Sequence, residues 1–201
     1  MNEQQHEREP NQHDIERSHE AEPRDGPRIY VASLSDYNAG LLHGRWIETV
    51  DDQEAMQEQI AEMLRTSPTT ARYGDKAEEW AIHDYEGFGP LRLGEYEALS
   101  TITRIAAGIE EHGEAFAAWA DHVGFNEADE LDRFDELYRG EWDNPEEYAE
   151  QLLDDMGATA ALERLPEWLH SYVELDIAGF ARDLDMGGDI TVIDKPEGGV
   201  W

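Results

Sequence analysis

Hydrophobic and polar residues alternate in three short segments of the amino-terminal half, a pattern typical of strands with one covered face. The segments are RIYVASL (28–34), GRWIETV (44–50) and EEWAIHDYEGF (78–88). Before the third segment, apolar residues recur every three or four positions, which predicts a helix. Its apolar face holds Met56, Ile60, Met63 and Leu64, and the capping-box spacing of Asp51 and Glu54 marks its start.

Two segments between these elements are rich in turn residues, and we expect loops there. They are SDYNAG (35–40) and TSPTTARYGD (66–75).

Helical spacing of apolar residues continues through the middle of the chain and most of its carboxyl-terminal part. We expect helices at 96–109, at 116–123 before Gly124, from Asn126 to Gly140, from Asn144-Pro145-Glu146-Glu147 to Gly157, from about Pro166, and around IAGFARDL (177–184). Asn as cap, Pro at the first helical position and Glu three residues after the cap make the start at Asn144 the clearest of these signals.

The last segment, DITVID–KPEGG–VW (189–201), predicts a hairpin. Strands at both ends with helices between them predict an α+β fold and not a wound parallel sheet. Residues 1–27 contain no aromatic residue and read as a disordered charged tail. We expect an elongated chain of small domains, with short antiparallel sheets at both ends and a helical middle. The predicted parts are the tail at 1–27, an α+β domain at 28–94, a central helical domain at 95–132 and an α+β domain at 133–201.

Net charge changes the interpretation of these helices. The 201 residues include 48 Asp and Glu against 15 Lys and Arg, which gives a net charge of −33, and only Lys76 and Lys195 are lysines. Self-repulsion on this scale destabilises a compact state, so the acidity needs a reason. Nucleic acid is not expected as a direct ligand, because its phosphates require clustered bases. A basic partner is the electrostatic complement.

The acids are densest between residues 127 and 155, where thirteen Asp or Glu stand against Arg133 and Arg139. Apolar residues recur there at helical spacing, so we expect two helices that hold the carboxylates on their outward faces. The expected partner-binding carboxylates are Asp129, Glu130, Asp132, Asp135, Glu136, Glu141, Asp143, Glu146, Glu147, Glu150, Asp154 and Asp155.

Motifs for catalysis or for a cofactor are not found, so we expect neither. The sequence has no nucleophile elbow, phosphate loop or H-E-x-x-H motif, and His83 and Asp84, as strand neighbours, point to opposite faces. The chain has no cysteine, which excludes disulfides and fits a reducing cytoplasm. No apolar run approaches the ~20 residues of a membrane span, so we expect a cytoplasmic protein without a membrane partner.

A calcium-binding loop is an alternative interpretation of residues 183–194. Asp183, Asp185, Gly188, Asp189 and Asp194 match much of a twelve-residue loop. The fifth place is a glycine, the twelfth is Asp where Glu is usual, and KPEGG follows where an exit helix should begin. A helix that ends in Gly-Gly before a strand also explains the segment, so we expect no metal and keep a calcium-binding module as an alternative.

Three blocks in this order resemble the ArdA-type antirestriction proteins: residues 29–47, residues 78–88, and the run from YRGEWDNPEEYAEQLL to DITVID. The most specific positions are Tyr37, Asn38, Gly40, Gly44 and Trp46, the run from Ala81 to Glu86, and Ala181-Arg182-Asp183-Leu184 before Gly188-Asp189-Ile190. The resemblance covers roughly residues 28–201. This chain departs from the family by its long tail, by an extended loop around 66–77 and by ending at Trp201.

The resemblance implies a curved homodimer of three small domains that imitates bent B-form DNA. Such proteins occupy the DNA-binding groove of type I restriction–modification enzymes and protect incoming mobile genetic elements, without catalytic residues. At one charge per about 1.7 Å of duplex, the 66 excess negative charges of a dimer (two chains of 33) correspond to roughly 110 Å of DNA. We expect the dimer interface in the carboxyl-terminal third, where apolar helix faces carry Tyr148, Leu152, Trp168, Leu169 and Tyr172.

Salt adaptation is a second explanation of the acidity, because halophilic proteins accept a large net charge. Both causes can act together, and a salt-adapted protein with another binding role stays an alternative. The composition of the host's ribosomal and metabolic proteins distinguishes the two explanations.

Overall fold

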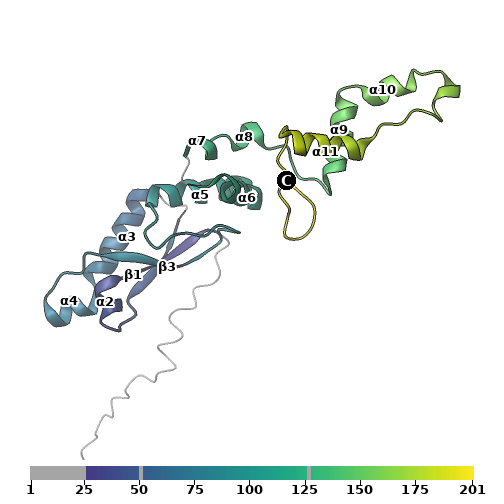
Figure 1. Cartoon of the computed structure of the whole chain (residues 1–201). Helices are drawn as coiled ribbons and strands as arrows, with labels where there is room; N and C mark the ends of the chain where they lie inside the picture. The colour runs from purple at the N-terminus through teal and green to yellow at the C-terminus, as the bar shows by residue number, and fades with distance from the viewer. Residues whose placement is uncertain (1–25, 50–51, 126–127) are drawn as a thin grey trace, which may run out of the picture. The chain divides into compact units, whose positions relative to one another are not determined.

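The computed structural model describes residues 26–49, 52–125 and 128–201, without the side chains of residues 128 and 129. The chain divides into two compact units, Met1–Gly87 and Phe88–Trp201. Figure 1 shows one small sheet together with many helices, which is the predicted α+β fold. The finer division into three domains stays a prediction. Among the described residues, no helix is both long and apolar enough to cross a membrane.

A three-stranded antiparallel sheet forms the core of the first unit, with the strand order β2-β1-β3. Its strands are β1 (Arg28–Ser33), β2 (Gly44–Glu48) and β3 (Trp80–Glu86), so the three predicted strands are confirmed with shorter ends. The register between β1 and β3 shifts at Tyr30/Val31, which leaves His83 as an extra residue in β3. Such a bulge bends the bulged strand and increases its twist.

Helix α3 (Gln53–Arg65) packs on β1 and β2 through the buried side chains of Met56, Ile60 and Met63, as its apolar spacing predicts. Its cap is Asp52, whose Oδ1 accepts a hydrogen bond from the backbone N–H of Ala55 at 2.8 Å. The helix therefore begins one residue later than the expected capping box. Asp51 itself lies outside the described residues.

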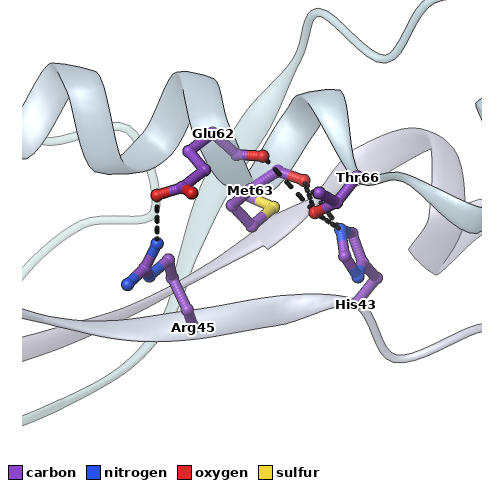
Figure 2. A network of polar contacts seen from close by, with 5 residues as sticks. All are labelled: His43, Arg45, Glu62, Met63 and Thr66. Atoms are coloured by element: carbon purple, nitrogen blue, oxygen red, sulfur yellow. Dashed lines mark hydrogen bonds and ion pairs between the residues drawn. The ribbon is translucent and has the colours of Figure 1, made fainter.

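The carboxyl-terminal end of α3 is held by residues at the start of β2 (Figure 2). His43 Nε2 donates a hydrogen bond to the Met63 carbonyl at 2.8 Å, and Thr66 Oγ1 donates to the same carbonyl at 2.9 Å. At the preceding residue, the side chain of Glu62 pairs with Arg45 at 3.2 Å. The last carbonyls of a helix have no partner within it, so these side chains satisfy them and join α3 to the sheet.

Both segments expected to be loops contain a short helix, so that prediction was wrong. Helix α2 (Leu34–Asn38) is capped by Ser33, and helix α4 (Pro68–Tyr73) is capped by Ser67 and ends at Gly74, with φ 82°. Turn-rich composition did not exclude them, because Ser, Pro and Gly are also the residues that begin and end helices.

Asp36 joins these two short helices from inside the first unit, where its side chain is fully buried. Its Oδ1 accepts hydrogen bonds from both the backbone N–H and the hydroxyl of Thr69. Burial by itself raises the pKa of a carboxyl, but hydrogen bonds from Ser33, Thr69 and Ser67 outweigh it and lower the pKa of Asp36 to about 2. The carboxylate therefore stays charged and fixes α4 against α2.

In the second unit, helices α5 (Leu99–His112) and α6 (Glu114–Val123) pack on each other. They approach so closely that a Cβ at Gly108 would overlap the ring of Phe116. Gly113 joins them with φ 66°, a conformation that favours glycine. Helix α5 starts three residues later than predicted, and Tyr96 before it is 72% exposed.

The helix expected between Asn126 and Gly140 is divided into α7 (Ala128–Leu131) and α8 (Phe134–Leu137). Leu131 and Phe134 at the break are both buried. The acid-rich region between residues 127 and 155 thus contains three helices and not two. Helices this short are unstable alone, so tertiary contacts of their apolar residues decide where they begin and end.

Helix α9 (Pro145–Asp155) begins as predicted, with Asn144 accepting a hydrogen bond from the N–H of Glu147 at 2.9 Å. Helix α11 (Ile177–Gly187) ends at Gly188 with φ 77°, also as predicted. Both pack together through the buried Ala149 and Ala181.

The segment between α9 and α11 differs from expectation. It contains the unpredicted helix α10 (Ala158–Glu163), and the helix expected from Pro166 is only a 3₁₀ turn, η1 (Glu167–Leu169). Trp168 and Tyr172, which should line its apolar face, are 70% and 79% exposed. Within the described chain that face has too little to pack against, and packing supplies most of a helix's stability.

The carboxyl-terminal hairpin forms, although as isolated bridges and not as a regular second sheet. Ile193 and Trp201 exchange backbone hydrogen bonds, and Lys195 N–H donates to the Gly199 carbonyl at 3.0 Å. Val200 bridges Asp194 within the hairpin and also bridges Trp142, so the chain end is joined to the segment before α9.

Replacing Asp36 with Asn tests its role as a buried anchor. The lowered pKa makes the charge stabilising above about pH 4, so at pH 7 we expect Asp36→Asn to reduce the free energy of unfolding by about 2 kcal/mol. The difference from wild type should narrow as pH falls from about 4 to 2, where the wild-type carboxyl becomes protonated. Urea unfolding across this range measures it. Asp75→Asn, an exposed acid of the same unit, is the control and should change stability little; an equal effect there would contradict the anchor.

Candidate functional site

The acidic segment, residues 130–155, displays the carboxylates that the sequence pattern marked for partner binding. Eleven of those twelve side chains are described, and the side chain of Asp129 is the exception. Ten of the eleven are exposed, and Glu130 is partly buried. The structure therefore presents these carboxylates to solvent, as a binding surface requires.

Aromatic side chains support α7 and α8 from the inner side. Phe134 lies between two rings, with centroid distances of 5.3 Å to Phe116 and 4.9 Å to Tyr138. Trp119 on α6 donates its indole N–H to the carbonyl of Glu130 at 3.3 Å. The two short helices thus rest on α6, and Asp135 and Glu136 of α8 are exposed.

Trp142 holds the link between α8 and α9. Its indole N–H donates to the Arg139 carbonyl at 2.9 Å, and its ring contacts Tyr148 at a centroid distance of 5.4 Å. Its backbone exchanges two hydrogen bonds with Val200, at 3.0 and 2.8 Å. Because both the side chain and the backbone of Trp142 are held, the position at which α9 starts is fixed.

Four of the predicted carboxylates already have a basic partner within the described chain, and we call them the compensated carboxylates. The pairs are Glu130–Arg133 at 2.9 Å, Asp132–Arg104 at 3.8 Å, Asp135–His112 at 3.2 Å (when the histidine is protonated) and Glu141–Lys195 at 2.7 Å. Three of these four pairs join separate parts of the second unit. They hold its segments together as well as carrying charge.

Glu141 is the most engaged of the four. Its Oε2 accepts a hydrogen bond from Lys195, and its Oε1 accepts one from the indole N–H of Trp201 at 3.3 Å. The hydrogen bond from Lys195 is the main reason that the pKa of Glu141 is lowered, and the same bond raises the pKa of Lys195. Burial raises the pKa of the neighbouring Tyr138. Glu141 thus anchors the terminal hairpin to the acidic segment.

Five other carboxylates, the uncompensated carboxylates, form no ion pair with any described residue. They are Glu136, Asp143, Glu146, Glu150 and Asp154. The remaining two predicted residues only accept amide hydrogen bonds: Glu147 from the N–H of Asp143, and Asp155 from Gln151.

Three of the uncompensated carboxylates follow one face of α9. Glu146, Glu150 and Asp154 are spaced four residues apart, so they are stacked along the helix at intervals of about 6 Å. Tyr148 and Ala149 lie on another side of the helix, where Ala149 is fully buried. Like charges at this spacing repel each other and lower helix stability. The row is not explained by a need of the fold.

A second row with the same spacing was missed in the sequence. Glu54, Glu58 and Glu62 are exposed along α3 in the first unit, and among the described residues only Glu62 of the three forms an ion pair, with Arg45. The spacing i, i+4, i+8 was the available signal. It was overlooked because the acids of α3 are less concentrated than those of residues 127–155.

Apart from Arg133, which is three residues from Glu130, the compensating bases had no such signal. Lys195 lies 54 residues after Glu141, and Arg104 lies 28 residues before Asp132. Only the folded chain brings such residues together, so local sequence patterns do not reveal which carboxylates remain free.

Residues 183–194 do not have the conformation of a calcium-binding loop, and His83 and Asp84 do not form an acid–base pair with each other. Asp183 and Asp185 lie within α11, so the first half of the candidate calcium loop is helical. Among the described residues, no group of three or more His, Asp or Glu side chains is placed to hold a metal ion. His83 packs edge-on against Tyr37, and Asp84 accepts a hydrogen bond from the N–H of Tyr85.

The fold and this surface define an acidic α+β protein that displays ordered rows of carboxylates. The model of the family described as "Antirestriction protein (ArdA)" matches residues 29–197, so the chain belongs to the ArdA antirestriction family. No curated protein matches the chain. The resemblance of the three sequence blocks is thereby confirmed, and antirestriction is the general function. Restriction–modification enzymes are accordingly its partner class.

Charge substitutions at the two ends of α9 should have opposite effects on stability. Acids oppose the helix dipole at the carboxyl-terminal end, where the last turn has no base, so Asp154→Asn should raise the free energy of unfolding by about 0.5 kcal/mol. Glu147→Gln, in the first turn, should lower it by a similar amount, because Glu147 favours the dipole and caps Asp143. Thermal unfolding of both variants at low salt measures the difference. Shifts in the same direction would show that the dipole does not decide stability here.

Proposed function

We propose that this protein imitates the charge of a DNA duplex, occupies the DNA-binding groove of type I restriction–modification enzymes and blocks them competitively. The row of free carboxylates along α9 carries the proposal. The ArdA family match supports antirestriction in general, and the following arguments concern the mechanism.

The linear charge density of α9 is close to that of one DNA strand. Its 11 residues span roughly 16 Å at a rise of about 1.5 Å per residue. They include five acids: Glu146, Glu147, Glu150, Asp154 and Asp155. This is about one negative charge per 3.3 Å, whereas a single strand of duplex DNA carries one per 3.4 Å. A groove that neutralises phosphates therefore meets a similar density of charge on this helix.

The helix retains this charge at a cost to its own stability. Glu150 is four residues from both Glu146 and Asp154, and each such pair of like charges costs roughly 0.2–0.5 kcal/mol. Asp154 and Asp155 also stand at the unfavourable end of the helix dipole. A feature that opposes folding is best explained by binding.

Binding explains the activity without catalysis. We propose that the protein uses no cofactor and no metal, acts in the cytoplasm, and has no nucleic acid or membrane partner. Its carboxylates instead pair with the Arg and Lys side chains that otherwise hold phosphates.

Salt adaptation remains a second explanation of the composition, because the chain has only two lysines among 15 basic residues. Salt adaptation predicts that the host's other proteins are also acidic. It also predicts that neutralising the row of carboxylates along α9 weakens inhibition no more than neutralising other carboxylates. The comparison of variants below therefore also distinguishes the two explanations.

Two fourfold variants of equal charge test the proposal in a cleavage assay with a type I enzyme. One neutralises uncompensated carboxylates (Glu136→Gln, Asp143→Asn, Glu150→Gln and Asp154→Asn). The other neutralises the compensated carboxylates (Glu130→Gln, Asp132→Asn, Asp135→Asn and Glu141→Gln). At about 0.5 kcal/mol for each lost contact, the first variant should inhibit about thirtyfold more weakly. The second should retain most inhibition, since its carboxylates are already paired.

Competition and salt provide the controls. Added DNA should relieve inhibition, salt should weaken it, because exposed charges are screened beyond about 8 Å at physiological strength, and each single neutralisation should be nearly silent. Circular dichroism checks that both fourfold variants remain folded. Equal losses in the two variants would attribute inhibition to net charge alone. Abolition by one substitution in a folded protein would replace distributed mimicry with a localised site.

We also propose that the protein is a homodimer through its carboxyl-terminal third. Trp168 and Tyr172 are 70% and 79% exposed there, which leaves an apolar surface for a second copy to cover. Tyr148, Leu152 and Leu169, the other expected interface residues, are partly buried within their own chain.

Light scattering at micromolar concentration should give the mass of two chains. Trp168→Ser with Tyr172→Ser should shift it towards one chain, because the pair removes the largest exposed rings of this region. Tyr96→Ser, which removes a ring that is 72% exposed outside this region, should leave the dimer intact. A monomeric wild type in moderate salt would contradict the proposal.

A further inference from the structure

A cavity of about 230 Å³ lies within the second unit, beside the acidic segment. Its walls come from α6, α8, the segment before α9, the first turn of α9, the turn after α11 and the chain end. Six aromatic side chains line it: Trp119, Phe134, Tyr138, Trp142, Tyr148 and Trp201. Some of these rings support the acidic segment, but support alone does not require an open space between them.

The indole N–H groups of the cavity walls are engaged within the protein, so these rings present their faces to the space. Each of the three indole N–H groups has an internal acceptor: the Glu130 carbonyl for Trp119, the Arg139 carbonyl for Trp142, and Glu141 Oε1 for Trp201. The faces of such rings are electron-rich and attract cations. The chemistry of the walls therefore favours a cation or another flat group.

The size of the cavity limits the occupant. Sites for drug-sized ligands and cofactors measure roughly 300–1,000 Å³, whereas an apolar cavity of about 150 Å³ already holds benzene. At 230 Å³ the cavity fits one large side chain of a partner better than a cofactor.

Charge complementarity favours a basic side chain. The two segments that supply most of the wall, 134–148 and 188–201, contain nine acids and only two bases, Arg139 and Lys195. Lys195 is paired with Glu141. Arg139 also lines the cavity, and it donates to the carbonyls of Glu136 and Tyr138 at 2.7 and 3.3 Å. Asp189 lines the cavity and Asp143 stands beside Trp142, and neither has an ion-pair partner among the described residues.

We propose that this aromatic cavity receives one arginine side chain of the restriction–modification enzyme, as an anchor within the interface. A guanidinium is flat and weakly hydrated and stacks on aromatic faces better than an ammonium does. This inference rests on the proposed function for its partner. It adds a discrete, short-range contact to an attraction that is otherwise distributed over many carboxylates.

Direct binding to the cavity is tested without the enzyme. N-acetyl-arginine amide is titrated into the full chain, and the three lining indole N–H signals are followed by NMR. The citrulline analogue, which has the same shape without the charge, is the matched ligand. We expect the arginine probe to shift these signals at millimolar concentration and the citrulline probe to shift them at least tenfold less. Equal shifts, or none, would overturn the proposal.

A blocked cavity provides the matched protein variant. Thr191 is exposed at the wall, so Thr191→Trp should fill the space without disturbing the buried core. Thr159→Trp, at an exposed position of α10, makes the same substitution away from the cavity. Thr191→Trp should abolish the arginine-induced shifts and weaken inhibition of a type I enzyme about tenfold, with the salt dependence unchanged. Thr159→Trp should change neither.

The two measurements separate the cavity from the proposed function. If wild type fails to inhibit any type I enzyme, the proposed function fails, while the arginine titration still decides whether the cavity binds a guanidinium. If wild type inhibits and both threonine variants inhibit equally well, the anchor is wrong and distributed mimicry stands. Circular dichroism and thermal unfolding ensure that the comparison is made between folded proteins.

Discussion

Electrostatic self-repulsion is the constraint on which the other features of this chain depend. With 48 acids and 15 bases, most carboxylates cannot have a basic partner within the chain. The positions of the few bases therefore decide which carboxylates are paired. In the described residues they join segments that are distant in sequence: Arg28 with Glu86, Arg104 with Asp132, and Lys195 with Glu141. These pairs hold strands, helices and the terminal hairpin together, and most acids of α9 remain unpaired. Because bases are scarce, a few carboxylates form ion pairs that stabilise the fold, and others, such as those of α9, remain exposed without an ion pair in the described part of the chain.

Aromatic residues stabilise the short helices of the second unit, a role that a larger apolar core has in other proteins. Helices α7 and α8 have four residues each and are too short to be stable alone. Trp119, Phe134 and Trp142 hold them and the start of α9 through ring contacts and through indole hydrogen bonds to backbone carbonyls. Indoles suit this task because one ring both buries apolar area and supplies a donor. The outer side chains are then free to be almost entirely acidic.

The proposed function combines long-range attraction to a basic groove with a short-range contact in the aromatic cavity. Rows of carboxylates at four-residue spacing attract a basic groove over a distance, but each contact contributes little in water. An aromatic cavity excludes water locally and strengthens a single contact. Inhibition that depends on many weak pairs and on one anchor tolerates most single substitutions on the acidic surface.

Local patterns determined a large share of this fold from the sequence alone. The three strands, α3, the start of α9 at Asn144 and the end of α11 at Gly188 were predictable, because alternation, apolar spacing and caps depend on neighbouring residues. The sequence also determined that the acids between 130 and 155 face outward, since apolar residues take the other positions. Tertiary structure alone decided the division of α7 from α8 and the failure of the helix after Pro166, because burial selects among short helices. It also decided which carboxylates are compensated and where aromatic rings enclose a cavity, because these depend on residues such as Glu141 and Lys195 that meet only in the folded chain.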